Sequence, residues 1–188
     1  MQTYTTKDLQ ARFKELGYQW YSFHLIGIRS KNYVANTFCD SFILYNNGQV
    51  LRFEGTTRPG SYYLVHLLNP KGTSILKPGQ YVDTWTLGYH KGEYLAWTQY
   101  KPVTVFRELD QNEYVDQLEL DAEDTGMFGI NIHRSSNFTI SKLVDKWSAG
   151  CQVFANPNNF INFVQLSKDS KQDFFTYTLL DEWIPSQQ

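Results

Sequence analysis

The chain has 188 residues, of which 41% are hydrophobic, 19% charged and 16% aromatic, and its formal net charge is −2. A chain of this length can bury one core, so we expect a single domain over residues 1–188. The small net charge gives no basic surface and argues against nucleic acid as the main partner. No apolar run approaches the roughly 18 residues that a membrane-spanning helix needs, which argues against membrane insertion.

The N-terminal region predicts one helix over about residues 5–17. Thr5 or Thr6 can cap its start, and Gly17 is the expected stop. Apolar residues recur along it at helical spacing: Leu9, Phe13 and Leu16. We expect this stripe to pack the helix against the outside of the domain, as a brace.

From Trp20 onward, short aromatic and β-branched runs are typical of strands. The expected strands cover residues 23–29, 41–45, 50–53, 84–87, 94–100, 103–107 and 174–180. The Asn-Asn-Gly-Gln run at 46–49 predicts the turn of a hairpin between the second and third of them. Residues 121–126 are acidic and polar, and we expect a connection without regular structure there.

A second helix is expected near the C-terminus. Asn156-Pro157-Asn158 opens it, it continues over residues 159–166, and its Phe160, Phe163 and Val164 should face inward. Short strands at close intervals, two helices and no βαβ alternation predict a mainly β fold with a few helices. The expected architecture is a mostly antiparallel sandwich or barrel.

Two segments in the second half of the chain carry the most chemistry. Residues 129–134 alternate with a period of two, which predicts a strand with His133 on one face. Farther on, a Ser-Ala-Gly run at 148–150 leads to Cys151 at the start of an apolar strand over 153–155. A cysteine that faces a histidine on a neighbouring strand can act as a thiolate nucleophile beside a base. We expect the site to be organised around this pair.

The ionisation of the thiol decides whether such a pair can react. A free thiol titrates near 8.5, so an adjacent imidazolium would have to lower the pKa of Cys151 for it to be mostly thiolate at neutral pH. Gly150 leaves the backbone uncovered, so a carbonyl oxygen can approach an N–H group there. Cys39 has no glycine before it and is interpreted as a core or surface thiol. Because the N-terminus lacks a secretory signal, we expect two free thiols.

His133 followed by Ser148-Ala149-Gly150-Cys151 resembles the signature of the L,D-transpeptidase (YkuD-type) catalytic domain, in which a histidine on one strand precedes a Ser-x-Gly-Cys segment. The Thr-Thr-Arg-Pro-Gly-Ser-Tyr segment at 56–62 is similar to the Thr-Pro-x-Gly-aromatic turn at the start of that family's sheet. The likeness covers about residues 50–165. It implies the fold of that family, a β-sandwich or barrel, for this catalytic core.

In that family the cysteine is acylated by a peptidoglycan stem peptide at a bond between an L-centre and a D-residue, and an amine or water resolves the thioester. The resemblance implies Cys151 as the nucleophile and His133 as its base. It also implies that the N–H groups of Gly150 and Cys151 donate to the oxyanion, and that Ser148 lies in the turn that supports the histidine. It implies no cofactor.

The sequence departs from the family pattern beside both residues. Ala149 stands where His or another polar residue is common, and Val153 stands where an arginine often holds a substrate carboxylate. Arg134 follows the histidine in place of a glycine, and it can supply a guanidinium from another direction. We expect Arg134, Gln152 and Ala149 to contact the substrate.

The other polar candidates are weaker. His90, between two glycines, is interpreted as a solvated hairpin tip, with a reach into the cleft and a contact with substrate as the alternative. His24 and His66 are interpreted as structural. No His/Cys pair has the spacing of a zinc site, so no metal is expected. The carboxylates within 121–126 are interpreted as a solvated loop rather than as a glycosidase pair.

The sequence thus leaves two hypotheses of function. The first is a cysteine peptidase or transferase acting on peptidoglycan peptides. Because no secretory signal is seen, this hypothesis favours a phage-type wall peptidase that is cytoplasmic as synthesised and reaches the wall after lysis or as part of a virion. The second is a non-catalytic virion structural or wall-binding β domain with a decayed site. The sequence makes no prediction of the oligomeric state.

Overall fold

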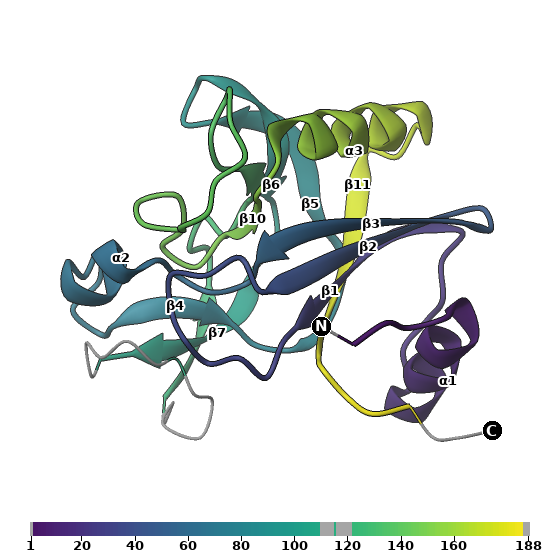
Figure 1. The fold of residues 1–188 in the computed structure, drawn as a ribbon, viewed down its shortest axis with the longest axis horizontal. Helices are drawn as coiled ribbons and strands as arrows, with labels where there is room; N and C mark the ends of the chain where they lie inside the picture. The colour runs from purple at the N-terminus through teal and green to yellow at the C-terminus, as the bar shows by residue number, and fades with distance from the viewer. Residues whose placement is uncertain (1, 110–114, 116–121, 186–188) are drawn as a thin grey trace.

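The computed structural model describes residues 2–109, 115 and 122–185. Within them the main sheet closes into a barrel, with neighbouring strands in the order β1 (Phe23–Arg29), β11 (Phe174–Asp181), β5 (Gly79–His90), β6 (Tyr94–Gln99), β9 (Ile132–Arg134), β10 (Gln152–Phe154), β3 (Gln49–Thr56) and β2 (Asp40–Asn46). The β1–β11 and β9–β10 pairs are parallel and the other neighbours are antiparallel. The mainly β prediction is confirmed, and of the two expected forms the chain adopts the barrel (Figure 1).

The barrel draws on more of the chain than the family resemblance covers. It begins at Phe23 and ends at Asp181, so residues 50–165 supply only part of it. The predicted turn at 46–49 joins β2 and β3, whose pairing runs from Asn46 opposite Gln49 to Asp40 opposite Gly55.

A smaller antiparallel sheet lies beside the barrel, with β4 (Thr73–Leu76), β7 (Val103–Glu108) and β8 (Glu123–Gly126) in that order. β8 lies in the segment that was expected to be irregular, and that expectation is wrong for residues 123–126. Pairing with β7 satisfies its backbone, and Arg107 binds the Asp124 carboxylate at 2.9 Å. Asp121, at the start of the segment, lies outside the described residues.

The N-terminal helix α1 (Thr6–Leu16) is formed as predicted. Thr5 and Asp8 make a capping box, in which each side chain accepts a hydrogen bond from the backbone N–H of the other residue. Gly17 closes the helix at a φ of 70°. Of the predicted apolar stripe, Leu16 is 38% exposed, whereas the other two members are buried against the outside of β1 and β2.

The C-terminal helix α3 (Pro157–Asp169) packs against β9 and β10, and it is seen at the top of Figure 1. Asn156 caps it by accepting a hydrogen bond from the Asn158 N–H. Its inward residues are those predicted, and they join the aromatic core of the barrel: Phe160, Phe163 and Val164. A short helix, α2 (Ser61–Val65), follows β3.

The parallel pair β9–β10 positions the candidate site. Val153 lies opposite His133, and the Gln152 N–H donates to the Asn131 carbonyl at 2.9 Å. Cys151 therefore lies just before β10, level with the residues that lead into β9. The strand expected at 129–134 begins only at Ile132, after Gly129 turns the backbone with a φ of 71°.

Candidate active site

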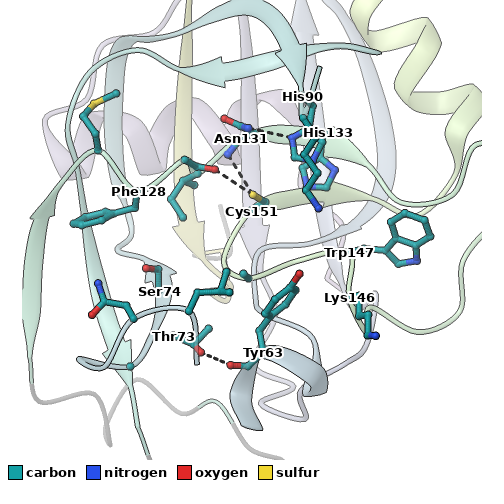
Figure 2. A pocket seen from close by; sticks show the side chains of 18 of the residues that line it. Tyr63, Thr73, Ser74, His90, Phe128, Asn131, His133, Lys146, Trp147 and Cys151 are labelled. Atoms are coloured by element: carbon teal, nitrogen blue, oxygen red, sulfur yellow. Dashed lines mark hydrogen bonds between the residues drawn. The ribbon is translucent and has the colours of Figure 1, made fainter. Parts of the chain in front are cut away.

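A cavity of about 450 Å³ lies where the barrel and the three-stranded sheet meet, a size within the range of ligand pockets. Its lining includes Cys151, His133 and His90 from the barrel side, and Ser74 and Arg107 from the small sheet. Figure 2 shows Cys151 in the middle of this pocket, with His133 and His90 on one side. The two residues that the sequence singles out therefore face one cavity.

The Cys151 thiol is partly buried and is held by the backbone that leads into β9. Its Sγ accepts a hydrogen bond from the Asn131 N–H and donates one to the Gly129 carbonyl, each at 3.4 Å. Burial raises the pKa of Cys151 to about 11, while the Asn131 N–H and the charge of Lys91 act in the opposite direction. The expectation of a lowered thiol pKa is therefore wrong, because the loss of water around the thiolate outweighs these two favourable contributions.

His133 is buried, with 2% of its surface exposed. Its Nδ1 lies 2.7 Å from the Arg134 carbonyl oxygen, which can only accept a hydrogen bond. The proton of the neutral ring is therefore on Nδ1, and Nε2 carries a lone pair. Burial, followed by the neighbouring His90, lowers the pKa of His133 to about 3.

The thiol and the imidazole are not hydrogen-bonded to each other in this structure. His133 Nε2 is a buried atom without a hydrogen-bond partner among the described residues, and the Cys151 thiol donates to Gly129 instead. Both groups are neutral. Two residues that line one cavity thus carry a proton donor, the Cys151 thiol, and an unused proton acceptor, His133 Nε2.

His90 is the second imidazole of the pocket. Its ring stacks on that of His133, with centroids 4.0 Å apart and planes 18° apart. It is only 7% exposed, so its interpretation as a solvated hairpin tip is wrong and the alternative, a reach into the cleft, is what the structure has. His90 is the last residue of β5, directly before the turn that leads into β6, and burial lowers its pKa to about 4.

Ser148 and Gly150 form the turn before Cys151. Their contacts differ from those that the resemblance implies. The Gly150 N–H donates to Ser148 Oγ at 3.1 Å, and that hydroxyl donates to the Cys151 carbonyl at 2.9 Å. The Gly150 N–H is therefore already engaged and is not free to bind an oxyanion. Ser148 stabilises the turn before Cys151, and among the described residues its hydroxyl makes no hydrogen bond to His133. The Cys151 N–H has no acceptor within the described part of the chain.

Of the three other expected substrate contacts, one lines the cavity. Ala149 does so, beside Cys151. Arg134 instead lays its guanidinium carbon 3.5 Å from the centre of the Tyr94 ring and is not part of the lining. Gln152 is fully buried, because its amide joins the Gly150 carbonyl at 3.2 Å to the Tyr177 hydroxyl at 2.8 Å. Among the described residues, Arg134 and Gln152 thus do not join the lining of this cavity, and their contact with substrate stays a prediction.

Sequence reasoning missed two residues that hold the site. The Tyr94 hydroxyl lies 3.2 Å from His133 Nδ1 and donates to the Arg134 carbonyl at 3.1 Å. Asn131 contacts Cys151 through its backbone and His90 through its side chain. The period of two in 129–134 places Asn131 on the same face as His133, and this signal could have found it.

The segment 56–62 packs against the turn formed by residues 148–150, which precedes Cys151. The Gly60 N–H donates to the Ser148 carbonyl at 2.9 Å, and a Cβ on Gly60 would collide with the backbone of Asp145. Arg58, in the same segment, is buried and pairs with the buried Asp40 at 3.0 Å. The motif thus contacts the turn that presents the thiol.

The cavity carries positive charge. Lys91, Lys146 and Arg107 belong to its lining, and none of the described lining residues is an aspartate or a glutamate. Arg107 is paired with Asp124, whereas Lys91 and Lys146 form no ion pair within the described residues. Lys146 lies over the ring of Tyr62, with Nζ 4.2 Å from its centre.

The remaining candidates lie outside the pocket. Cys39 is a free, partly buried thiol, and its Sγ accepts a hydrogen bond from Ser30 Oγ at 3.2 Å. His24 is fully buried, whereas His66 stacks on Tyr62 at the surface. In the part of the chain that the structure describes, no three His, Cys, Asp or Glu side chains gather in a way that could hold a metal ion.

A comparison of the chain with models of protein families gives no match, and neither does a comparison with curated proteins. Among the described helices, none combines the length and the apolar character needed to cross a membrane.

Proposed function

We propose that this protein is a cysteine-dependent acyl-transfer enzyme acting on peptidoglycan stem peptides, and that its reaction is hydrolysis by a phage-type wall peptidase. One observation carries the proposal. Cys151, which directly precedes β10, and His133 on the neighbouring parallel strand β9 line the same cavity, and the Nε2 of His133 has no hydrogen-bond partner among the described residues. The order of the His and Ser-x-Gly-Cys motifs, which resembles that of the L,D-transpeptidases, supplies the substrate class.

The first half of the reaction forms a thioester. Substrate enters the pocket, Cys151 rotates away from the Gly129 carbonyl, and its thiol proton passes to His133 Nε2 as Sγ attacks the scissile carbonyl carbon. Because burial favours the neutral forms of both groups, proton transfer accompanies the attack rather than preceding it. The tetrahedral adduct then collapses, the C–N bond breaks, and the leaving amine takes the proton from His133.

The second half restores the enzyme. A water molecule gives a proton to the freed Nε2 lone pair and its oxygen attacks the thioester carbon. Collapse of this adduct breaks the C–S bond, releases a carboxylic acid and returns the proton to sulfur. An amine in place of water would give transpeptidation by the same steps.

The charge of the pocket fits an acidic peptide. Lys91 and Lys146 supply two cations without carboxylate partners among the described residues, so a substrate carboxylate would neutralise them. Stem peptides carry carboxylates at or near their D-centres. The family's arginine after the cysteine is replaced here by Val153. We propose that Lys91 and Lys146 bind the substrate carboxylate in its place.

The test is incubation with purified sacculi and mass spectrometry of the released muropeptides, which identifies both the bond and the acceptor. We expect Cys151→Ala to reduce release to background. His133→Ala should reduce it by a factor of roughly 100 to 10,000, the range of general base catalysis. Cys39→Ala is the matched control, because Cys39 lies outside the pocket, and should release products at the wild-type rate. Full activity of folded Cys151→Ala would refute the proposal.

The second candidate, a non-catalytic wall-binding or virion domain, is favoured by a specific observation. Burial suppresses both charged forms of the pair, and the Gly150 N–H is already engaged. In that case Cys151→Ala should bind sacculi as tightly as the wild type in a sedimentation assay, and neither protein should release muropeptides. Product release by the wild type would exclude this second function.

A further inference from the structure

The side chain of His90 is fixed by two contacts, one with His133 and one with Asn131. Its ring lies on that of His133, and its Nδ1 is 3.1 Å from Asn131 Nδ2. The Asn131 side chain is itself fixed from the other side, because its Oδ1 lies 2.9 Å from the Gln99 N–H. Figure 2 shows the Asn131–His90 bond above Cys151 in the same pocket.

This chain of hydrogen bonds determines the tautomer of His90. A backbone N–H can only donate, so Asn131 must present its oxygen to Gln99 and its NH₂ group to His90. His90 Nδ1 is then an acceptor without a proton. The proton of the neutral ring is on Nε2, and His90 and His133 are opposite tautomers stacked face to face.

The His90 Nε2–H is available to a ligand. Among the described residues it has no hydrogen-bond partner. Unlike His133 Nε2, it is not fully buried, so another molecule can reach it. His90 lines the cavity together with Cys151. His90 thus carries, on a ring that lines the pocket, a fixed and neutral N–H donor that the acid–base chemistry of His133 does not use.

An acyl-transfer site needs such a donor. Negative charge develops on the carbonyl oxygen in the tetrahedral adduct, and hydrogen-bond donors that are already oriented stabilise it. Here the Gly150 N–H is bound to Ser148 Oγ, whereas the Cys151 N–H has no acceptor among the described residues and is one free backbone donor of this turn. A second donor can come from a side chain elsewhere in the lining.

We propose that His90 is a catalytic residue that donates its Nε2–H to the carbonyl oxygen of the substrate and remains neutral throughout. This inference rests on the proposed function. No proton leaves His90, and Asn131 acts as a positioning residue that keeps the donating tautomer in place.

The experiment compares three substitutions of His90 on purified sacculi. His90→Phe keeps a ring to stack on His133 but has no donor, and we expect kcat to fall roughly 100-fold with little change in KM. His90→Gln has an N–H donor at a similar reach and should recover at least tenfold of that loss. His90→Ala should be no better than His90→Phe. His66→Phe, outside the pocket, is the matched control and should be unaffected.

The outcomes separate this inference from the function on which it rests. An inactive wild type would overturn both. An active wild type with an equally active His90→Phe, or with His90→Gln no better than His90→Phe, would overturn the donor role alone. Because a variant can fail to fold, ¹⁵N NMR of the wild-type histidines gives an independent test. His90 should have a protonated Nε2 and an unprotonated Nδ1 at neutral pH, and the reverse tautomer would refute the proposal.

Discussion

At the scale of single residues, the environment of Cys151 determines its reactivity. Its thiol is partly buried beside the backbone that leads into β9, and this burial raises its pKa to about 11. A thiolate that is only a small fraction of the total should increase about tenfold for each pH unit. In Cys39→Ala protein, the rate of iodoacetamide alkylation of Cys151 should therefore rise from pH 7 to pH 10 without reaching a plateau.

Circular dichroism at each pH would show that the protein stays folded during this titration. A rate that levels off below pH 8 would mean that Cys151 exists as a thiolate paired with an imidazolium. That result would contradict the neutral pair described above. It would instead agree with the sequence-based expectation of a lowered pKa.

Gly150 is the second residue whose local geometry can be tested. Its φ of 120° is rarely adopted by residues with a side chain, and a Cβ would lie 2.2 Å from the Ser74 carbonyl oxygen. Both atoms of that contact belong to the backbone framework, so neither can move cheaply. Gly150→Ala should destabilise the fold by about 2 kcal/mol or more, measured by urea unfolding, and should abolish activity.

Gly129→Ala is the matched comparison. Gly129 also has a positive φ, 71°, but a Cβ there would meet nothing within 4 Å. The cost should be limited to the backbone conformation, about 1 kcal/mol. Equal destabilisation by the two substitutions would contradict the role of the Ser74 contact.

At the scale of elements, a side-chain hydrogen bond through the barrel interior joins β10 to β11. Gln152 on β10 accepts a hydrogen bond from the Tyr177 hydroxyl on β11 at 2.8 Å, although these strands are not neighbours in the sheet. Both side chains are fully buried, so removing either one leaves a buried polar atom unsatisfied. Gln152→Leu and Tyr177→Phe should each destabilise the protein by about 1–3 kcal/mol.

A double-mutant cycle tests this connection. Because the two groups bond to each other, the double variant should lose less stability than the sum of the single losses, by about 1 kcal/mol. Strict additivity in urea unfolding would show that the bond does not link the strands. The turn before Cys151 would then be supported by Ser148, Gly60 and the Gln152 amide without a link to β11.

The elements also show what the sequence can and cannot predict. The capped helix α1, the hairpin of β2 and β3 and the inward face of α3 follow from local periodicity and turn chemistry, and each was predicted. The strand β8 was missed because its residues carry no apolar alternation, and its pairing with β7 comes from the tertiary structure. Nothing local in the sequence indicates that β1 pairs with β11 in parallel to close the barrel.

The same division holds at the candidate site. Cys151 and His133 were found because their residue types and strand patterns are local signals, and the structure brings both to one cavity. The positions of Gln152 and Arg134 depend on which side of β10 faces the core and on the ring of Tyr94, which no spacing reveals. The raised thiol pKa likewise depends on burial by distant segments.

At the scale of the whole molecule, the packing of α1 on the barrel should make stability depend on pH. His24, on β1, is fully buried among the rings of Phe13, Trp20 and Tyr45, and neither of its ring nitrogens has a hydrogen-bond partner among the described residues. Burial lowers its pKa in the folded state to about 4, from 6.5 in the unfolded chain. Below about pH 6.5 the unfolded chain therefore binds a proton that the folded protein does not, and stability falls until the pH reaches the folded value.

His24→Phe isolates this contribution, because His90 and His133 titrate in the same direction but are unchanged in the variant. At pH 7.5 the variant should be at least as stable as the wild type, since it removes two unsatisfied buried nitrogens. At pH 5 its advantage should be greater by about 2 kcal/mol, the linkage expected for a group that is protonated only in the unfolded state. Guanidinium unfolding at the two pH values measures the difference. If the advantage of the variant is the same at both pH values, protonation of His24 does not couple to the docking of α1, and other shifted groups, among them His90 and His133, account for the pH dependence of stability.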